Sequence, residues 1–145
     1  MFGLQRALQM LVEEEGLDAA FNRHRLLADA VRAAVSAWGE NGLMELNITS
    51  PDARANSVTA VRLAEDKQVS ELLDWCEQTA SVKLGITIGE LNNRGFRIGH
   101  MGYVNAPMVM GVLGVVETAL HALQWYSGSS GVAAAADVLG RSLQQ

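Results

Sequence analysis

One arginine inside an apolar, glycine-bounded run is the part of this sequence best suited to chemistry. The run is Phe96-Arg97-Ile98-Gly99-His100-Met101-Gly102. Phe96 and Ile98 alternate with Arg97, a pattern that predicts a strand with two apolar side chains on one face and the arginine alone on the other. Gly99 and Gly102 predict that the strand ends here and that the backbone comes close to another group.

The guanidinium of Arg97 can recognise a carboxylate through two parallel hydrogen bonds, because its planar fork matches the two carboxylate oxygens. The first interpretation of Arg97 is therefore a binding residue for a small acid. The second interpretation is a partly buried structural arginine that pairs with an Asp or a Glu, since structural ion pairs are common in proteins. The residues alone leave both interpretations open.

This run, with Asn105 and the long apolar helix after it, resembles the C-terminal small domain of class V pyridoxal-phosphate-dependent aminotransferases of the serine–glyoxylate and alanine–glyoxylate type. The resemblance extends over almost the whole chain and is strongest from Phe96 to Leu139. It implies that Arg97 binds the α-carboxylate of a small amino or keto acid. One departure lies in the loop Gly85–Arg94, which in the family is richer in glycine and carries a lysine near Gly95.

The composition excludes several classes of protein. The 145 residues carry a formal net charge of −5 and suffice for one domain with a core. Basic residues are not clustered, so we expect no nucleic-acid partner. The longest apolar run, near 103–116, is interrupted by Asn105 and Pro107 and is too short to span a membrane. Cys76 is the only cysteine and the N-terminus has no signal-peptide layout, which together predict a reducing, cytoplasmic location.

The spacing of apolar residues predicts an α+β fold, with a small antiparallel or mixed sheet and helices on one face. We expect a single domain over 1–145, made of a helical lead-in (1–38), a β-α-β-β-α core (43–125), and a linker with a terminal helix (126–145). Predicted strands cover 43–46, 57–63, 82–86 and 96–100, and predicted helices cover 2–15, 18–38, 69–80, 106–125 and 132–139. The resemblance implies the small domain of fold type I pyridoxal-phosphate-dependent transferases.

Local signals predict several helix boundaries. Gly16 is expected to end the first helix, because glycine favours the position after a helix C-terminus. Asn105 is expected to cap the long apolar helix, and Ser130 can cap the last one. His24 and the arginines beside it are interpreted as a solvated face of the second helix.

The catalytic inventory is incomplete for the family that the chain resembles. A pyridoxal-phosphate enzyme needs a lysine for a Schiff base. Lys67 lies in a charged turn and Lys83 on a short strand with its head outward, so neither suits that role. Cys76 follows Trp75 on a helix and is interpreted as a packed thiol. No metal-ligand or phosphate-loop pattern is present. We therefore expect no catalytic residue in this chain and no pyridoxal phosphate bound to it alone.

Three hypotheses for the function remain. In the first, the chain is the substrate-carboxylate-binding domain of an aminotransferase for serine-, alanine- or glyoxylate-type acids, inactive alone because a large cofactor domain is missing. The resemblance would then place Met1 well past the middle of the full-length chain. In the second, the chain is a free-standing small-carboxylate-binding or dimerisation module. In the third, it is a structural remnant that forms a homodimer through an uncovered side of the helix 106–124.

Overall fold

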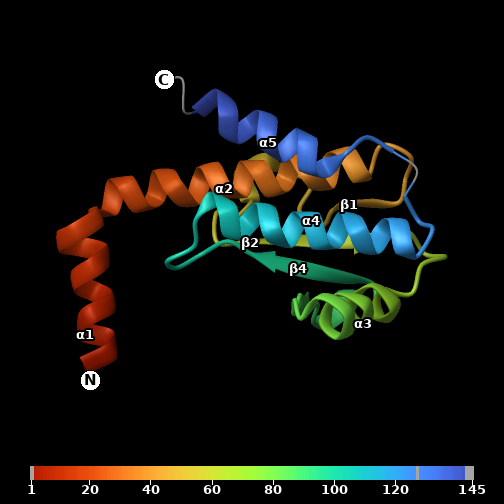
Figure 1. Cartoon of the computed structure of the whole chain (residues 1–145), viewed down its shortest axis with the longest axis horizontal. Helices are drawn as coiled ribbons and strands as arrows, with labels where there is room; N and C mark the ends of the chain where they lie inside the picture. Colours follow the sequence, from red (N-terminus) through yellow and green to blue (C-terminus); the bar gives the residue numbers. More distant parts are fainter. Residues whose placement is uncertain (1, 127, 143–145) are drawn as a thin grey trace.

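The computed structural model describes residues 2–126 and 128–142 and packs helices over one face of an antiparallel sheet (Figure 1). The four strands, in the spatial order β1-β2-β4-β3, are β1 (Met44–Leu46), β2 (Val58–Leu63), β3 (Gly85–Ile86) and β4 (Gly95–Gly99). The helices are α1 (Phe2–Gln9), α2 (Leu17–Trp38), α3 (Val69–Ala80), α4 (Ala106–Ala122) and α5 (Gly131–Ser142). A π-helical segment, η1 (Met10–Glu15), joins α1 to α2, and short 3-10 turns, η2 (Pro51–Ala53) and η3 (Gly89–Leu91), lie in loops.

The sheet has an apolar inner face, whereas its outer face also carries charged side chains, because successive side chains of a strand point to opposite sides. On β2, Val61 is fully buried and pairs with Phe96 of β4, which is also fully buried. Burial of a side chain such as Phe96 contributes about 1.5–3 kcal/mol to folding. The outer face carries Arg62 and Arg97 from these two strands, and Arg62 pairs across to Glu45 on β1.

The helices form a layer over the inner face of the sheet. α2, α4 and α3 lie side by side, and α5 packs against α2 and α4 (Figure 1). The contact between α2 and α5 is close, because a Cβ at Gly131 would lie 2.3 Å from the Trp38 ring and 2.8 Å from the carbonyl oxygen of Ala34. The apolar side chains of all these elements form one core.

The predicted α+β architecture is confirmed, and the sheet is antiparallel throughout. The third strand is shorter than predicted, since only Gly85–Ile86 pair with β4. The residues before it complete the C-terminal cap of α3: Ser81 has a φ of 55° and the Val82 N–H donates to the Cys76 carbonyl (3.0 Å). The long helix likewise ends at Ala122 rather than at 125.

The first helix stands away from the rest of the molecule. No residue of α1 or η1 is buried, and α1 leaves the body at a wide angle (Figure 1). Its apolar side chains are uncovered: Leu4 is 68% and Leu8 51% exposed. Gly16, with a φ of 85°, ends η1 and confirms the predicted boundary. Among the described residues, no helix is long and apolar enough to cross a membrane.

Glu117 on α4 joins three helices through one half-buried carboxylate. Its Oε2 accepts hydrogen bonds from Trp38 Nε1 on α2 (2.8 Å) and from the Val132 N–H on α5 (3.1 Å). Its Oε1 accepts from Ser130 Oγ (2.8 Å), and this hydroxyl oxygen also accepts from the Ala133 N–H (3.1 Å), so the predicted cap is confirmed. Burial alone would raise the pKa of Glu117, but the hydrogen bonds from Trp38, Val132 and Ser130 hold it below its ordinary value.

We predict that Glu117→Ala lowers the free energy of unfolding by about 1–3 kcal/mol, because the donors on Trp38 and Val132 lose their acceptor. The stabilisation requires the ionised carboxylate, whose pKa is lower in the folded chain. It is therefore complete above the ordinary carboxyl pKa and is lost as the pH falls through the folded value. Urea unfolding over an acid pH series measures both effects. Asp137→Ala, which breaks an exposed pair on α5, is the control, and equal losses in both variants would contradict the prediction.

Candidate functional site

Arg97 lies in the middle of β4 and points away from the helices. Phe96 and Ile98 on either side of it are buried, as the alternation predicts. Its Nε donates a hydrogen bond to the Ile86 carbonyl on β3 (2.8 Å). Within residues 2–126 and 128–142, its Nη1 and Nη2 groups have no hydrogen-bond partner. The guanidinium is thus held at one edge, and its two terminal nitrogens remain available for a ligand.

Gly85 makes room for the Arg97 side chain on the neighbouring strand. The two residues are paired in the register of β3 and β4. A Cβ at Gly85 would lie 3.3 Å from the Arg97 Cβ, which is closer than most Cβ contacts in proteins. It would also lie 3.6 Å from the Arg97 Nε, an ordinary van der Waals distance. The absent side chain therefore lets the arginine stem lie across the edge strand toward the Ile86 carbonyl.

The described residues contain no acidic partner for Arg97. The carboxylate of Glu45 on the same sheet face pairs with Arg62, and that of Glu65 pairs with Arg94 (2.5 Å). In the part of the chain that the structure describes, the ion pair required by the structural interpretation of Arg97 is therefore not formed.

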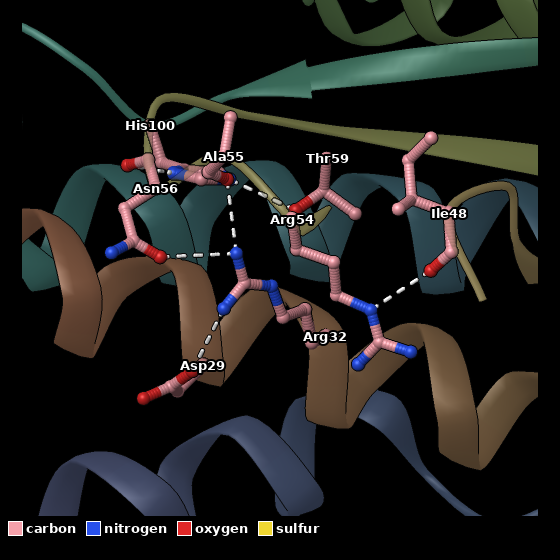
Figure 2. A network of polar contacts seen from close by, with 8 residues as sticks. All are labelled: Asp29, Arg32, Ile48, Arg54, Ala55, Asn56, Thr59 and His100. Atoms are coloured by element: carbon pink, nitrogen blue, oxygen red, sulfur yellow. Dashed lines mark hydrogen bonds and ion pairs between the residues drawn. The ribbon is translucent and has the colours of Figure 1, made fainter. Parts of the chain in front are cut away.

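His100 directly follows the end of β4, and its side chain is fully buried on the inner side of the sheet (Figure 2). Its Nδ1 lies 3.1 Å from the Asn56 carbonyl oxygen and its Nε2 lies 2.9 Å from Thr59 Oγ1. A carbonyl oxygen only accepts, so Nδ1 carries the proton and Nε2 accepts from the threonine hydroxyl. Burial lowers the pKa of His100 and keeps the ring neutral, although its bond to Asn56 opposes that shift.

Arg32 on α2 fixes the loop that passes under this histidine (Figure 2). Its Nη2 donates to the Ala55 carbonyl (2.9 Å) and to Asn56 Oδ1 (3.1 Å), and its Nη1 pairs with Asp29 (3.0 Å). The loop before β2 is thereby tied both to α2 and to the end of the strand that carries Arg97. Sequence reasoning assigned His100 no role, although the period of two already places it on the same side as Phe96 and Ile98.

The interpretation of the residues around position 24 as a solvated face is wrong for two of them. The Arg23 side chain is only 24% exposed and bonds to Glu15 and to the loop after β4. His24 Nε2 lies 3.2 Å from the Gly102 carbonyl oxygen. The carbonyls of Gly102 and Val104 lie close in space but about 80 residues along the chain, so a local charge pattern does not indicate them.

Both lysines form ion pairs with nearby carboxylates. Lys67 Nζ pairs with Asp66 (2.9 Å) and lies 5.8 Å from the centroid of the Trp125 ring. The Lys83 side chain is 79% exposed and its Nζ pairs with Glu77 (2.9 Å). Cys76 is fully buried and its burial raises the pKa of the thiol to about 11, which agrees with a packed rather than a nucleophilic thiol.

Sequence comparison identifies relatives over nearly the whole chain. The serine–glyoxylate aminotransferase of Methylorubrum extorquens is 32% identical over 141 residues, which are 96% of this chain and 34% of the relative. That of Arabidopsis thaliana is 35% identical over 140 residues, again 96% and 34%. The L-aspartate–glyoxylate aminotransferase of Paracoccus denitrificans is 31% identical over 134 residues, or 92% and 33%. No protein-family model matches the chain.

Structure comparison agrees with these relatives. The pyridoxamine–pyruvate aminotransferase of Mesorhizobium loti matches with a TM-score of 0.79 and 26% identity, over 89% of this chain and 32% of that one. The ureidoglycine–glyoxylate aminotransferase of Bacillus subtilis matches with a TM-score of 0.77 and 26% identity, over 88% and 32%. The fold is therefore that of a part of an aminotransferase.

The chain is homologous to class V aminotransferases of the serine–glyoxylate and alanine–glyoxylate type. It spans about one third of the length of the relatives that it matches, which is consistent with one domain of such an enzyme. The resemblance inferred from the run around Arg97 is thus confirmed at the level of the family.

We predict that acidification destabilises the chain through His100. The unfolded chain takes up a proton near the ordinary value of 6.5, whereas the folded chain resists protonation because its histidine pKa is lower. The stabilisation that depends on neutral His100 is therefore complete above that pH. Below it, the free energy of unfolding falls with a slope approaching about 1.4 kcal/mol per pH unit. Urea unfolding between neutral and mildly acid pH should show the slope in the parent and in the exposed-histidine control His121→Gln. Persistence of the slope in His100→Gln would contradict this assignment.

We also predict that Gly85→Val displaces the Arg97 side chain, because the added methyl groups occupy the space over which the arginine stem lies. The expected result is loss of the hydrogen bond between Arg97 Nε and the Ile86 carbonyl, seen as faster solvent exchange of the Nε proton by NMR. Gly99→Val is the matched control, since a Cβ there meets no atom within 4 Å. Equal exchange rates in the two variants would show that Gly85 does not position the arginine.

Proposed function

We propose that this chain is the part of a class V aminotransferase that binds the carboxylate of a small amino or keto acid, and that Arg97 is the binding residue. One observation carries the proposal: Arg97 is fixed through its Nε while both of its terminal nitrogens lack a partner among the described residues. A side chain held in this way has already lost much of its conformational freedom. It can therefore bind an anion at a lower entropic cost than a free surface arginine.

Binding would use the two terminal nitrogens of the guanidinium as parallel donors to the two carboxylate oxygens. Such charge-assisted, bidentate bonds are short and fix the orientation of the acid as well as holding it. The Ile86 carbonyl keeps the plane of the guanidinium in place, so the direction of approach is set by the sheet. The role of Arg97 is thus to bind and orient, and the chain itself provides no group that we assign to proton transfer.

The names of the relatives support a small keto acid as one substrate. The similar enzymes are named for glyoxylate or pyruvate as acceptor, whereas their donors include serine, aspartate and pyridoxamine. We propose glyoxylate or a similarly small acid for this protein and serine or alanine as the type of donor. The loop after β3 is the element where the preference would be set, because Thr87 anchors it to the carbonyls of Leu91 (2.5 Å) and Gly95 (3.0 Å) beside Arg97.

The chemistry of amino transfer would depend on pyridoxal phosphate held by a separate large domain. The ion pairs of Lys67 and Lys83 support this division, since each lysine already has a carboxylate partner within this chain. The uncovered apolar side of α1 and η1 is the surface that we propose to contact that domain. Homodimer formation stays a prediction; α4, which was expected to drive it, contacts α2, α3 and α5, and Met108 near its start is 56% exposed.

A chimera tests the proposal. The matching third of the Methylorubrum extorquens serine–glyoxylate aminotransferase is replaced by this chain, and transfer of the amino group from serine to glyoxylate is measured. We expect activity, and we expect Arg97→Met to raise the KM of the acids by roughly 10²-fold, because a bidentate ion pair of a few kcal/mol is lost. Arg62→Met is the matched control, since Arg62 lies on the same sheet face but is already paired with Glu45.

Two results would contradict the proposal. One is a folded chimera with bound cofactor that transfers no amino group. The other is an Arg97→Met variant whose KM equals that of Arg62→Met. Calorimetry of the chain alone with glyoxylate adds a further check. We expect weak binding there, since one two-point contact rarely repays the cost of association, and tight binding would favour the free-standing module instead.

A further inference from the structure

Arg23, near the start of α2, forms hydrogen bonds both to η1 and to the loop between β4 and α4. No other described side chain joins these two segments in this way. On one side its Nε and Nη2 donate to the two carboxylate oxygens of Glu15, at 2.6 Å and 2.8 Å. On the other side its Nη1 donates to the carbonyl oxygens of Gly102 (2.9 Å) and Val104 (2.8 Å). We call this set of contacts the Arg23 clasp.

The clasp differs from an ordinary surface ion pair. The side chains of Arg23 and Glu15 are only 24% and 23% exposed, and the geometry is bidentate. The hydrogen bonds from Arg23 lower the pKa of Glu15, and those to Glu15 raise the pKa of Arg23. Both partners are therefore charged at neutral pH. A lysine could not replace Arg23, because only the planar fork reaches the carboxylate and the carbonyls together.

Each end of the clasp has a defined place in the fold. Glu15 is the last residue of η1, directly before the Gly16 break, so it lies at the base of the α1–η1 arm. Gly102 and Val104 belong to the loop that starts where β4 ends and finishes at Asn105, the N-cap of α4. One guanidinium thus connects the arm to the loop that follows the strand carrying Arg97.

Little else in the described structure fixes the direction of the arm. None of its residues is buried, and Gly16, with a φ of 85°, separates it from α2 as a glycine elbow. A hollow of about 340 Å³ lies beside the clasp, lined among others by Met10, Tyr103 and Asn105, so the arm is not packed tightly onto the loop. Besides partial burial of Met10 and Leu11, the clasp is therefore the main contact that can set the angle of the arm.

We propose that Arg23 is a positioning residue that holds the α1–η1 arm at a fixed angle to the strand carrying Arg97. This inference rests on the function proposed above. The angle would set where a domain docked on the arm lies relative to Arg97. The distance between bound acid and cofactor would then depend on a contact remote from both. Since displacements of about 1 Å can cost roughly 10²-fold in rate, a fixed angle would matter for activity.

The test measures the angle in this chain, without any assay of amino transfer. Spin labels are attached to cysteines introduced at the exposed positions Gln5 on α1 and Ser36 on α2, and the distance between them is measured by pulsed electron paramagnetic resonance. Cys76 is fully buried, and the chain without added cysteines shows whether it takes up label. The parent should give one narrow distance distribution.

We expect Arg23→Met and Arg23→Lys to replace the narrow distribution by a broad one. Glu15→Ala should do the same, and because Glu15 lies outside the core this variant keeps the test valid if Arg23→Met fails to fold. Arg25→Met is the matched control, since Arg25 is exposed and bonds only to Asn22 among the described residues. Circular dichroism verifies the helix content of each variant.

Narrow distributions in both Arg23→Met and Glu15→Ala would overturn the proposal, even if their melting temperatures fell, because a merely stabilising pair would leave the angle unchanged. Retention of the narrow distribution in Arg23→Lys would show that charge alone suffices and would overturn the role of the fork. The distances do not depend on amino transfer. An inactive chimera with an intact angle would therefore count against the proposed function and leave the clasp standing.

Discussion

Burial of Phe96 and Ile98 beneath the helices is the constraint on which the rest of this structure depends. A strand with two buried neighbours has no freedom to rotate the residue between them, so Arg97 must face outward. The pairing of β4 with β2 on one side and with β3 on the other then supplies the Ile86 carbonyl that holds its Nε. Core packing and the geometry of the candidate site are two results of the same alternation.

A few polar side chains fix the arrangement of the helices. Each of them forms hydrogen bonds with partners on several elements. Glu117 collects donors from α2, from α5 and from the loop before it. His100 and Arg32 do the same for the loop before β2. Groups of this kind cost free energy when left unpaired, so they favour one arrangement of the helices over others that bury a similar apolar area.

Local patterns predicted the elements whose stability is mostly local. The bounds of α3, the cap at Asn105 and the outward direction of Arg97 all follow from periodicity and capping within a few residues. The same patterns missed what depends on distant partners. Arg23 meets the Gly102 carbonyl 79 residues later, and Glu117 meets Trp38 across the same separation. The predicted third strand is too long, because Val82 has a strong preference for strands but takes part in the C-terminal cap of α3.

The short edges of the sheet have a consequence for how copies of this chain can associate. The outer strands β1 and β3 have three and two residues, and the Ile86 carbonyl on the second of them is already occupied by Arg97. Few unpaired backbone N–H and C=O groups are thus left at the edges of the sheet to pair with a strand of another molecule. This protects the chain against edge-to-edge aggregation. A specific assembly of copies would therefore rely on contacts between side chains rather than on strand addition.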